Sequence, residues 1–333
     1  MTAAAERVMV PGYRHIPGHH CGSTALRNLL GFHGVEISEE MAFGLGAGAC
    51  FYYVVVDGTS PSRFTNGRVA RLEENFLELT GAPLRLRTDD DPGRSWQMAH
   101  ELVDGGRPAL LLTDLYYLDH YGRSAHFPGH AVVLAGYDAE RAWLSDTGFT
   151  ELQTTALESL AEARHSKQPV FELAGHVIDL PDAAGLDASS LASAAPRAIE
   201  RAAREMLEPS LGEYQGVPAL RRLAREIGAW PESADDWQWC ARFLYQVIER
   251  RGTGGGNFRR MYSRFLEEAG REESGLAGAA AERWSALAEA AREASEPERA
   301  DPRHWRRIST EAERVREAEE RLWDALLPPS PPG

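Results

Sequence analysis

The chain has 333 residues, enough for one large domain or two ordinary ones. Hydrophobic residues make up 43% of the sequence and charged residues 26%, the balance of a globular protein with a sizeable core. The formal net charge of −14 argues against nucleic acid and against an anionic membrane surface as partners, because both are bound through basic residues.

The sequence also bounds the compartment. No apolar run approaches the roughly 18 residues that span a membrane, and the first seven residues hold no apolar stretch that could act as a secretory signal. The three cysteines, Cys21, Cys50 and Cys240, are odd in number and far apart, which argues against a disulfide framework. We therefore expect a cytoplasmic protein, in which a cysteine with histidine and aspartate elsewhere in the chain is a candidate nucleophile.

The first 180 residues mix helical and strand patterns. Apolar spacing predicts helices from Cys21 to Gly34, from Ser38 onward, from Val69 to near Gly81, and over 96–103. Strand-like runs follow at 108–113, 131–135, 142–145 and 170–180. Because helices come first and strands later, an α+β domain fits better than alternating βαβ units.

The rest of the chain is almost entirely helical in pattern. Helices are predicted near 193–207, 217–228, 235–251, 257–269, 276–294 and 302–326. A connector of small and polar residues near 180–190 separates the mixed region from the helical one. The predicted organisation is a catalytic domain over 1–180, an all-α domain over 190–327, and a proline-rich disordered tail over 328–333.

Cys21 lies at the predicted start of an amphipathic helix. The helix N-terminus places partial positive charge and backbone N–H groups beside the sulfur, and both favour the nucleophilic thiolate. The alternative interpretation is a small buried cysteine at a helix start.

Residues 128–146 have the pattern of a hairpin with its loop near Asp138. If the loop is odd-numbered and centred on Ala139, Val132 lies opposite Asp146, and His130 is a diagonal neighbour of Asp146 on the same face. A two-residue loop would put the two side chains on opposite faces unless a bulge intervened. The alternative for His130 is an ordinary hydrogen bond at a strand end.

A helix-borne cysteine, then a strand histidine, then an aspartate on the adjoining strand is the chain order of papain-like enzymes. The segments 20–30, 37–41 and 43–48, continuing through those of His130 and Asp146, resemble the N-terminal domain of the butirosin biosynthesis protein H family. Residues 254–269 resemble the helical domain that accompanies it, so the resemblance covers most of the chain.

The resemblance implies a papain-like fold related to bacteriocin-processing cysteine peptidases, with Cys21, His130 and Asp146 at the positions of the family's catalytic pattern. The family's named member moves an aminoacyl group from a carrier-protein thioester to an aminoglycoside amine. Cys50 departs from the family pattern, which has a small or apolar residue there, and adds a second thiol of unassigned role.

Acyl transfer also needs an oxyanion hole. The backbone N–H of Cys21 is one natural donor, and His15 or His20 is a candidate for the side-chain donor, the alternative being that both are loop residues. The glycine-rich segment with Gly44 and Gly46 is interpreted as a flexible loop passing close to the active site, or else as plain helix-to-strand punctuation. The histidines before Cys21 lack the separated pairs of a structural zinc site, so no metal is expected.

Residues 250–264 form the one basic cluster of this acidic chain, with a glycine turn between two predicted helices. Arg250, Arg251, Arg259 and Arg260 are candidates for docking a phosphate or an acidic carrier protein. The alternative is a solvated helix face.

We therefore expect a cysteine-dependent acyltransferase that takes an acyl group from a carrier-protein thioester through acyl-Cys21 to a small amine, in specialised-metabolite biosynthesis and without a cofactor. A hydrolase or peptidase, or a carbon–carbon cyclase acting on a carrier-bound chain, would use the same residues. A non-catalytic binding module is the alternative outside enzymes.

Overall fold

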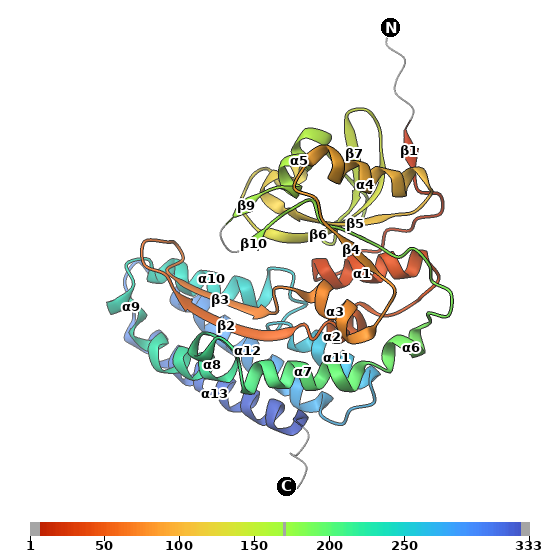
Figure 1. The fold of residues 1–333 in the computed structure, drawn as a ribbon. Coiled ribbons are helices and arrows are strands. Elements are labelled where there is room, and N and C mark those ends of the chain that lie inside the picture. Colours follow the sequence, from red (N-terminus) through yellow and green to blue (C-terminus); the bar gives the residue numbers. More distant parts are fainter. Residues whose placement is uncertain (1–6, 169–170, 328–333) are drawn as a thin grey trace. The chain divides into compact units, whose positions relative to one another are not determined.

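The computed structural model describes residues 7–168 and 171–327. They form two compact units, each traced by two segments of the chain: a sheet unit from residues up to Ala42 and Glu73–Leu191, and a helical unit from Phe43–Leu72 and residues from Ala192 onward (Figure 1). The fold is therefore mixed α/β, with an N-terminal sheet region and a C-terminal helical region. The predicted tail over 328–333 lies outside the described residues.

The sheet unit is built on an antiparallel sheet in the order β4-β11-β5-β6-β7-β8, with β1 paired to β6. Its strands are β1 (Val8–Met9), β4 (Arg85–Arg87), β5 (Ala109–Asp114), β6 (Pro128–Tyr137), β7 (Arg141–Ser145), β8 (Gln153–Ala156) and β11 (Val177–Asp179). A separate pair is formed by β9 (Lys167–Gln168) and β10 (Phe171–Glu172). Its helices are α1 (Cys21–Phe32), α3 (Leu72–Thr80), α4 (Pro92–Asp104), α5 (Leu157–Arg164) and α6 (Ala188–Ala192), with the short 3-10 turns η1 (Leu115–Tyr117) and η2 (Asp119–Tyr121).

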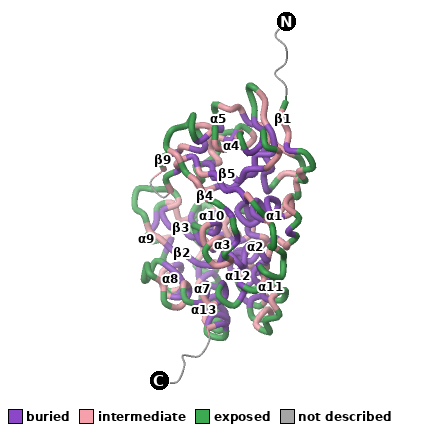
Figure 2. The backbone as a smooth tube through the Cα atoms, turned by 45° about the vertical axis from the view of Figure 1, so that its right-hand side comes forward, coloured by how far each residue is buried: buried purple, intermediate pink, exposed green. Residues whose placement is uncertain are grey.

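The central strands of this sheet are buried on both faces. Leu111 and Val132 belong to a core that includes residues of α4 and α5. The alternate residues Leu110, Leu112 and Val133 are buried as well, and α1 packs against β5 and β6. Figure 2 shows β5 as a buried run within this unit. The helix that begins at Cys21 and the strand that carries His130 are therefore directly packed elements.

The helical unit contains more than the predicted all-α domain. Its helices are α7 (Ala195–Leu207), α8 (Gly216–Glu226), α9 (Trp230–Ser233), α10 (Trp237–Glu249), α11 (Arg259–Glu268), α12 (Ser274–Ala294) and α13 (Pro302–Leu326), with the 3-10 turns η3 (Gly212–Tyr214) and η4 (Ile227–Ala229). The hairpin β2 (Ala49–Val55) and β3 (Arg63–Arg68) packs among them.

The position of this hairpin differs from the predicted division of the chain at 180–190. Aromatic side chains along its strands contact the helices: Phe51 packs on Trp284 with ring centroids 5.2 Å apart, and Phe64 on Phe243 at 5.5 Å. Residues 43–72 follow soon after the Cys21 helix in the sequence, but their aromatic side chains contact helices far along the chain. The boundary between the units consequently falls inside α2 (Glu39–Leu45).

A buried ion pair ties the hairpin to two helices. The Arg259 side chain is fully buried on α11 and donates to both carboxylate oxygens of Glu319 on α13, at 2.8 and 3.0 Å. Its remaining Nη1 donates to the carbonyl oxygens of Cys50, Gly67 and Asn257 at 2.9–3.0 Å. Arg259 therefore cannot present its charge to a partner, which removes it from the predicted docking cluster.

This network predicts a large difference between two adjacent arginines. Arg259→Met leaves the Glu319 carboxylate buried without its cation, and we expect a loss of about 3–5 kcal/mol in the free energy of unfolding. Arg260→Met is the matched control, since Arg260 is 38% exposed and pairs with Glu282, which is 73% exposed; its loss should stay under about 1 kcal/mol. Urea denaturation measures both, and equal losses would contradict the structural role of the buried pair.

Candidate active site

Cys21 is the first residue of α1, as the apolar spacing predicts. His20 caps the helix: its Nδ1 accepts a hydrogen bond from the backbone N–H of Ser23 at 3.2 Å. The Cys21 side chain is largely buried, with 8% of the residue exposed. The sulfur therefore lies at the positive end of the helix dipole, where a thiolate is stabilised.

A buried carboxylate organises the turn that leads into this helix. Glu39, at the start of α2, accepts hydrogen bonds from the backbone N–H groups of His19 and His20 at 2.8 and 2.7 Å, and from the Thr24 hydroxyl at 3.0 Å. Gly18 passes so close that a Cβ there would lie 2.5 Å from the Glu39 carboxylate. The sequence pattern around Ser38 indicates only a helix start, so this anchor of the Cys21 turn was not predicted.

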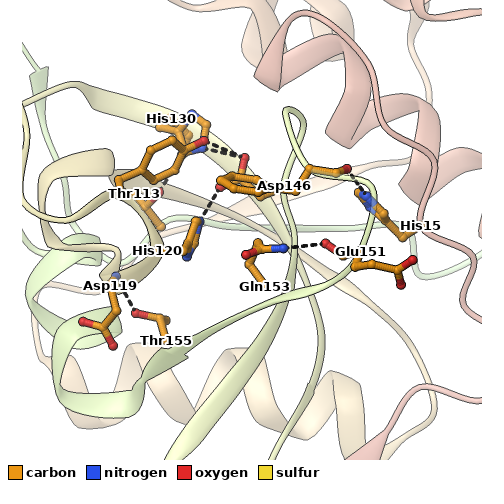
Figure 3. Close-up of polar contacts among 11 residues, drawn as sticks. His15, Thr113, Asp119, His120, His130, Asp146, Glu151, Gln153 and Thr155 are labelled. Carbon is orange, nitrogen blue, oxygen red and sulfur yellow. Dashed lines mark hydrogen bonds and ion pairs between the residues drawn. The ribbon is translucent and has the colours of Figure 1, made fainter.

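His130 and Asp146 come together as expected, but through a different hairpin. His130 Nε2 lies 3.0 Å from Asp146 Oδ1 (Figure 3). The turn closes on a backbone bond from Asp138 to Arg141, so its loop has two central residues and not an odd number. A bulge at Ala135 then shifts the register of β6 against β7, as the strand pairings on its two sides show. The bulge restores the shared face that a two-residue loop alone would have lost.

A second bulge aims His130. On the other side of β6, Thr113 pairs with His130 and Asp114 with Pro128, so Gly129 is the extra residue, with a φ of +83°. That φ suits glycine, because it lies in the left-handed region. The Thr113 hydroxyl donates to the His130 carbonyl at 2.9 Å and holds the bulged backbone in place.

The electrostatics of this pair favour a protonated imidazole. Burial lowers the pKa of His130, but the Asp146 carboxylate, its hydrogen bond and a hydrogen bond with the Cys21 side chain together raise the pKa of His130 to about 10. Burial raises the pKa of Asp146, but His130 and His120 outweigh it and hold the pKa of Asp146 below its usual range. Since Nε2 of His130 faces Asp146, Nδ1 is the ring nitrogen left to face Cys21.

His15 does not point at an oxyanion. Its Nε2 lies 2.8 Å from the Phe149 carbonyl, which can only accept, so its Nδ1 accepts from the Ser145 hydroxyl at 2.7 Å. The backbone N–H of Gly18 also donates to the Thr147 carbonyl at 3.0 Å. Both ring nitrogens of His15 are therefore used to tie the segment before Cys21 to the loop that carries Asp146, which leaves neither for the predicted contact with an oxyanion.

The structure places the two predicted substrate-binding glycines in the helical unit. Gly44 and Gly46 are buried at the end of α2 and just after it, which is not the flexible loop that the glycine content suggested. A Cβ on Gly44 would lie 2.0 Å from the Phe265 ring, and one on Gly46 would lie 2.7 Å from Leu72. Both glycines are explained by close packing within that unit.

Cys50 and the basic cluster also belong to the helical unit. Cys50 is fully buried, and burial raises the pKa of its thiol to about 11, although the Gln215 amide donates to the sulfur at 3.7 Å. Of the predicted docking residues, Arg250 and Arg251 are exposed and Arg260 is half-buried.

Two residues that the sequence pattern did not single out complete the surroundings of Asp146. His120 Nε2 lies 2.8 Å from Asp146 Oδ2, and the Tyr121 hydroxyl donates to Oδ1 at 3.2 Å. Both residues belong to η2, a short turn without helical or strand periodicity. The one signal is the run of aromatic and ionisable side chains over 116–121, between two predicted strands.

Among the described residues, no group of three or more histidine, cysteine, aspartate or glutamate side chains is arranged to hold a metal ion. Across the same part of the chain, no helix has the length and apolar character needed to cross a membrane.

Comparison with protein-family models assigns both regions of the chain. The model for butirosin biosynthesis protein H, N-terminal, matches residues 20–147. The chain belongs to the butirosin biosynthesis protein H family. A domain of unknown function (DUF4872) matches residues 158–326. No curated protein matches the chain significantly.

The match to the butirosin biosynthesis protein H family begins one residue before Cys21 and ends one residue after Asp146, so it contains the whole Cys21–His130–Asp146 set. The second match covers the long helices of the helical unit but not its hairpin. Family membership indicates an enzyme of antibiotic or other specialised-metabolite biosynthesis.

The raised pKa of His130 predicts how this imidazole responds to pH. Its protonated form should persist through neutral pH and be lost as the pH rises through about 10. In Asp146→Asn the charge that raises the pKa is gone while burial remains, so the midpoint should fall by several pH units. NMR of the His130 ring, followed against pH, measures both midpoints. An unchanged midpoint would contradict the coupling.

Proposed function

We propose that the chain is a cysteine-dependent acyltransferase with a papain-like catalytic unit, which moves an acyl or aminoacyl group from a carrier-protein thioester to an amine through acyl-Cys21. The observation that carries this proposal is that one buried imidazole, His130, contacts both Cys21 and Asp146. A thiol at a helix N-terminus, a base in contact with it and a carboxylate fixing that base meet the requirements of nucleophilic acyl transfer.

The first step consumes the thioester. The Cys21 thiolate attacks the acyl carbon, a new carbon–sulfur bond forms, and the bond to the carrier's sulfur breaks. The His130 imidazolium gives its proton to the departing sulfur, so the carrier leaves as a thiol and His130 becomes neutral. Acyl transfer changes no oxidation state, so the step as written requires no redox cofactor.

The second step delivers the acyl group. The acceptor amine attacks the acyl-Cys21 carbon, the carbon–nitrogen bond forms, and the bond to the Cys21 sulfur breaks. Neutral His130 takes the proton from the nitrogen, which restores the imidazolium beside the thiolate. With water in place of the amine, the same steps give hydrolysis, so the partition of acyl-Cys21 between amine and water separates transferase from hydrolase.

An oxyanion develops in both steps. The backbone N–H of Cys21 is in the first turn of α1, where no intrahelical acceptor exists, and is the main-chain donor we propose. We propose His20 as the side-chain donor in place of His15. Its Nδ1 accepts from Ser23, so in the neutral ring Nε2 carries the proton that an oxyanion would accept.

The nucleophile assignment predicts which thiol captures the acyl group. Incubation with a thioester donor should add one acyl mass to the wild-type protein and none to Cys21→Ala, as measured by intact-mass spectrometry. Cys50→Ala should retain the adduct, because the Cys50 thiol is fully buried and its raised pKa disfavours the thiolate. Loss of the adduct in a folded Cys50→Ala variant would contradict the assignment.

The carrier-protein part of the proposal depends on a local basic surface, because this chain and an acidic carrier both have negative net charge. Because Arg259 is buried, Arg250 and Arg251 are the exposed arginines of the predicted docking cluster. Reversing both to Glu should raise the KM for a carrier-bound donor about fivefold at low salt. It should not change the KM for a small thioester that carries no protein.

Two outcomes would count against docking at this cluster. Equal kinetics of wild type and the double variant with the carrier-bound donor would assign the cluster to a solvated helix face. The same loss with both donors would indicate misfolding or a structural role. The double variant Arg225→Glu/Arg283→Glu, at exposed positions on α8 and α12, makes the same change in net charge and is the control.

A further inference from the structure

The Asp146 carboxylate is hydrogen-bonded to two imidazoles. His130 Nε2 faces Oδ1 at 3.0 Å, and His120 Nε2 faces Oδ2 at 2.8 Å (Figure 3). The third donor, the Tyr121 hydroxyl, shares Oδ1 with His130 at 3.2 Å. Asp146 itself has no exposed surface. Among the described residues, His120 is thus the one side chain that donates to Oδ2.

His120 is buried and packed against aromatic rings where it makes this contact. Its side chain is 7% exposed and contacts the rings of Tyr121 and Phe149, with centroids 4.7 and 5.2 Å away. The preceding Asp119 anchors the turn: its backbone N–H donates to the Thr155 hydroxyl at 3.1 Å, and its carboxylate accepts from the Ala156 backbone and the Ser159 hydroxyl at 2.7 and 2.8 Å.

The other ring nitrogen of His120 has no comparable contact. Nδ1 is buried and lacks a hydrogen-bond partner among the described residues. Burying an unpaired polar atom costs free energy, so packing alone does not account for a histidine here. The contact with Asp146 is what the imidazole contributes at this position.

The ionisable groups around His120 set the direction of its effect. Asp146 faces it directly, His130 and Tyr121 share that carboxylate, Cys21 lies beyond His130, and Asp119 is its chain neighbour. A carboxylate only accepts hydrogen bonds, so Nε2 of His120 carries the proton toward Asp146. A donor on Oδ2 favours the ionised carboxylate, which is the form that supports His130.

We propose that His120 is a positioning residue of the acyl-transfer site: it holds Oδ2 of Asp146, and so keeps the carboxylate ionised and Oδ1 directed at His130. The inference rests on the proposed function, since it assigns His120 a role in keeping Cys21 reactive. Without the donor, the carboxylate must rotate to share the donors of Oδ1, or take up a proton. Either change weakens the contact that keeps His130 protonated beside Cys21.

Two amide substitutions at His120 distinguish a hydrogen bond to Oδ2 of Asp146 from the mere presence of a polar side chain. His120→Gln places an amide N–H where Nε2 of the imidazole was, whereas His120→Asn has the same amide one methylene shorter and cannot reach Oδ2. We expect His120→Asn to lower kcat/KM for acyl transfer about tenfold, mainly in kcat, and His120→Gln to stay within about threefold of wild type. His100→Gln, at a half-buried histidine paired with Asp104 on α4, is the matched control.

The second readout needs no acyl donor. The rate of Cys21 alkylation by iodoacetamide, followed against pH by intact mass, reports the thiolate. In His120→Asn the rate at pH 7 should fall about tenfold, with the alkaline rate little changed, because a free thiolate at high pH no longer needs the imidazolium. Far-UV circular dichroism verifies that each variant is folded.

The outcomes separate this inference from the proposed function. If wild type transfers acyl groups and both amide variants match it in kcat/KM and in alkylation, His120 does not position Asp146. If Gln and Asn lose activity equally, reach to Oδ2 is not the cause and the inference is likewise overturned. If His120→Asn slows Cys21 alkylation at pH 7 and His120→Gln does not, but the wild type accepts no acyl group from any thioester, the proposed function fails while the positioning of Asp146 by His120 stands.

Discussion

The buried carboxylate of Asp146 is the constraint on which the rest of the site depends. A charge with no exposed surface is stable only if hydrogen bonds replace its hydration. His130 comes to it from β6, and His120 and Tyr121 come from η2. The loop that carries Asp146 is itself tied to the segment before Cys21. The donors of this one charge therefore come from the strand and the turn, and its loop is tied to the segment that leads into the Cys21 helix.

The same physics recurs at two other carboxylates. Glu39 collects backbone and hydroxyl donors at the entrance to α1, and so fixes the turn that presents Cys21. In the helical unit, Glu319 collects the Arg259 guanidinium and the indole N–H groups of Trp284 and Trp323. Each carboxylate joins segments far apart in sequence. Removing one donor from such a group leaves a buried charge under-satisfied, which makes these positions sensitive in a way that apolar contacts are not.

Periodic patterns carried most of what the sequence could predict. The apolar spacing after Cys21 placed the start of α1, and the run over 131–135 located β6. The features that the sequence did not predict depend on contacts between residues far apart in the chain. The bulge at Ala135, which gives His130 and Asp146 a common face, depends on cross-strand register. The burial of Arg259 depends on Glu319, sixty residues away, and His120 lies in a turn too short to show periodicity. Apolar faces recur at regular spacing along the sequence and can be predicted from it, whereas polar contacts between distant residues produce no such spacing.

The two halves of the proposed reaction make opposite demands on His130. Expelling the carrier thiol needs an imidazolium, which the raised pKa of His130 provides at neutral pH. Accepting a proton from the amine needs a neutral imidazole. The contacts resolve this conflict, because Cys21 is one of the groups that raise the pKa of His130. Once the sulfur is acylated, it no longer carries a charge to stabilise the imidazolium, while burial continues to lower the pKa. In the proposed reaction, formation of acyl-Cys21 would thus convert His130 from the acid of the first step toward the base of the second.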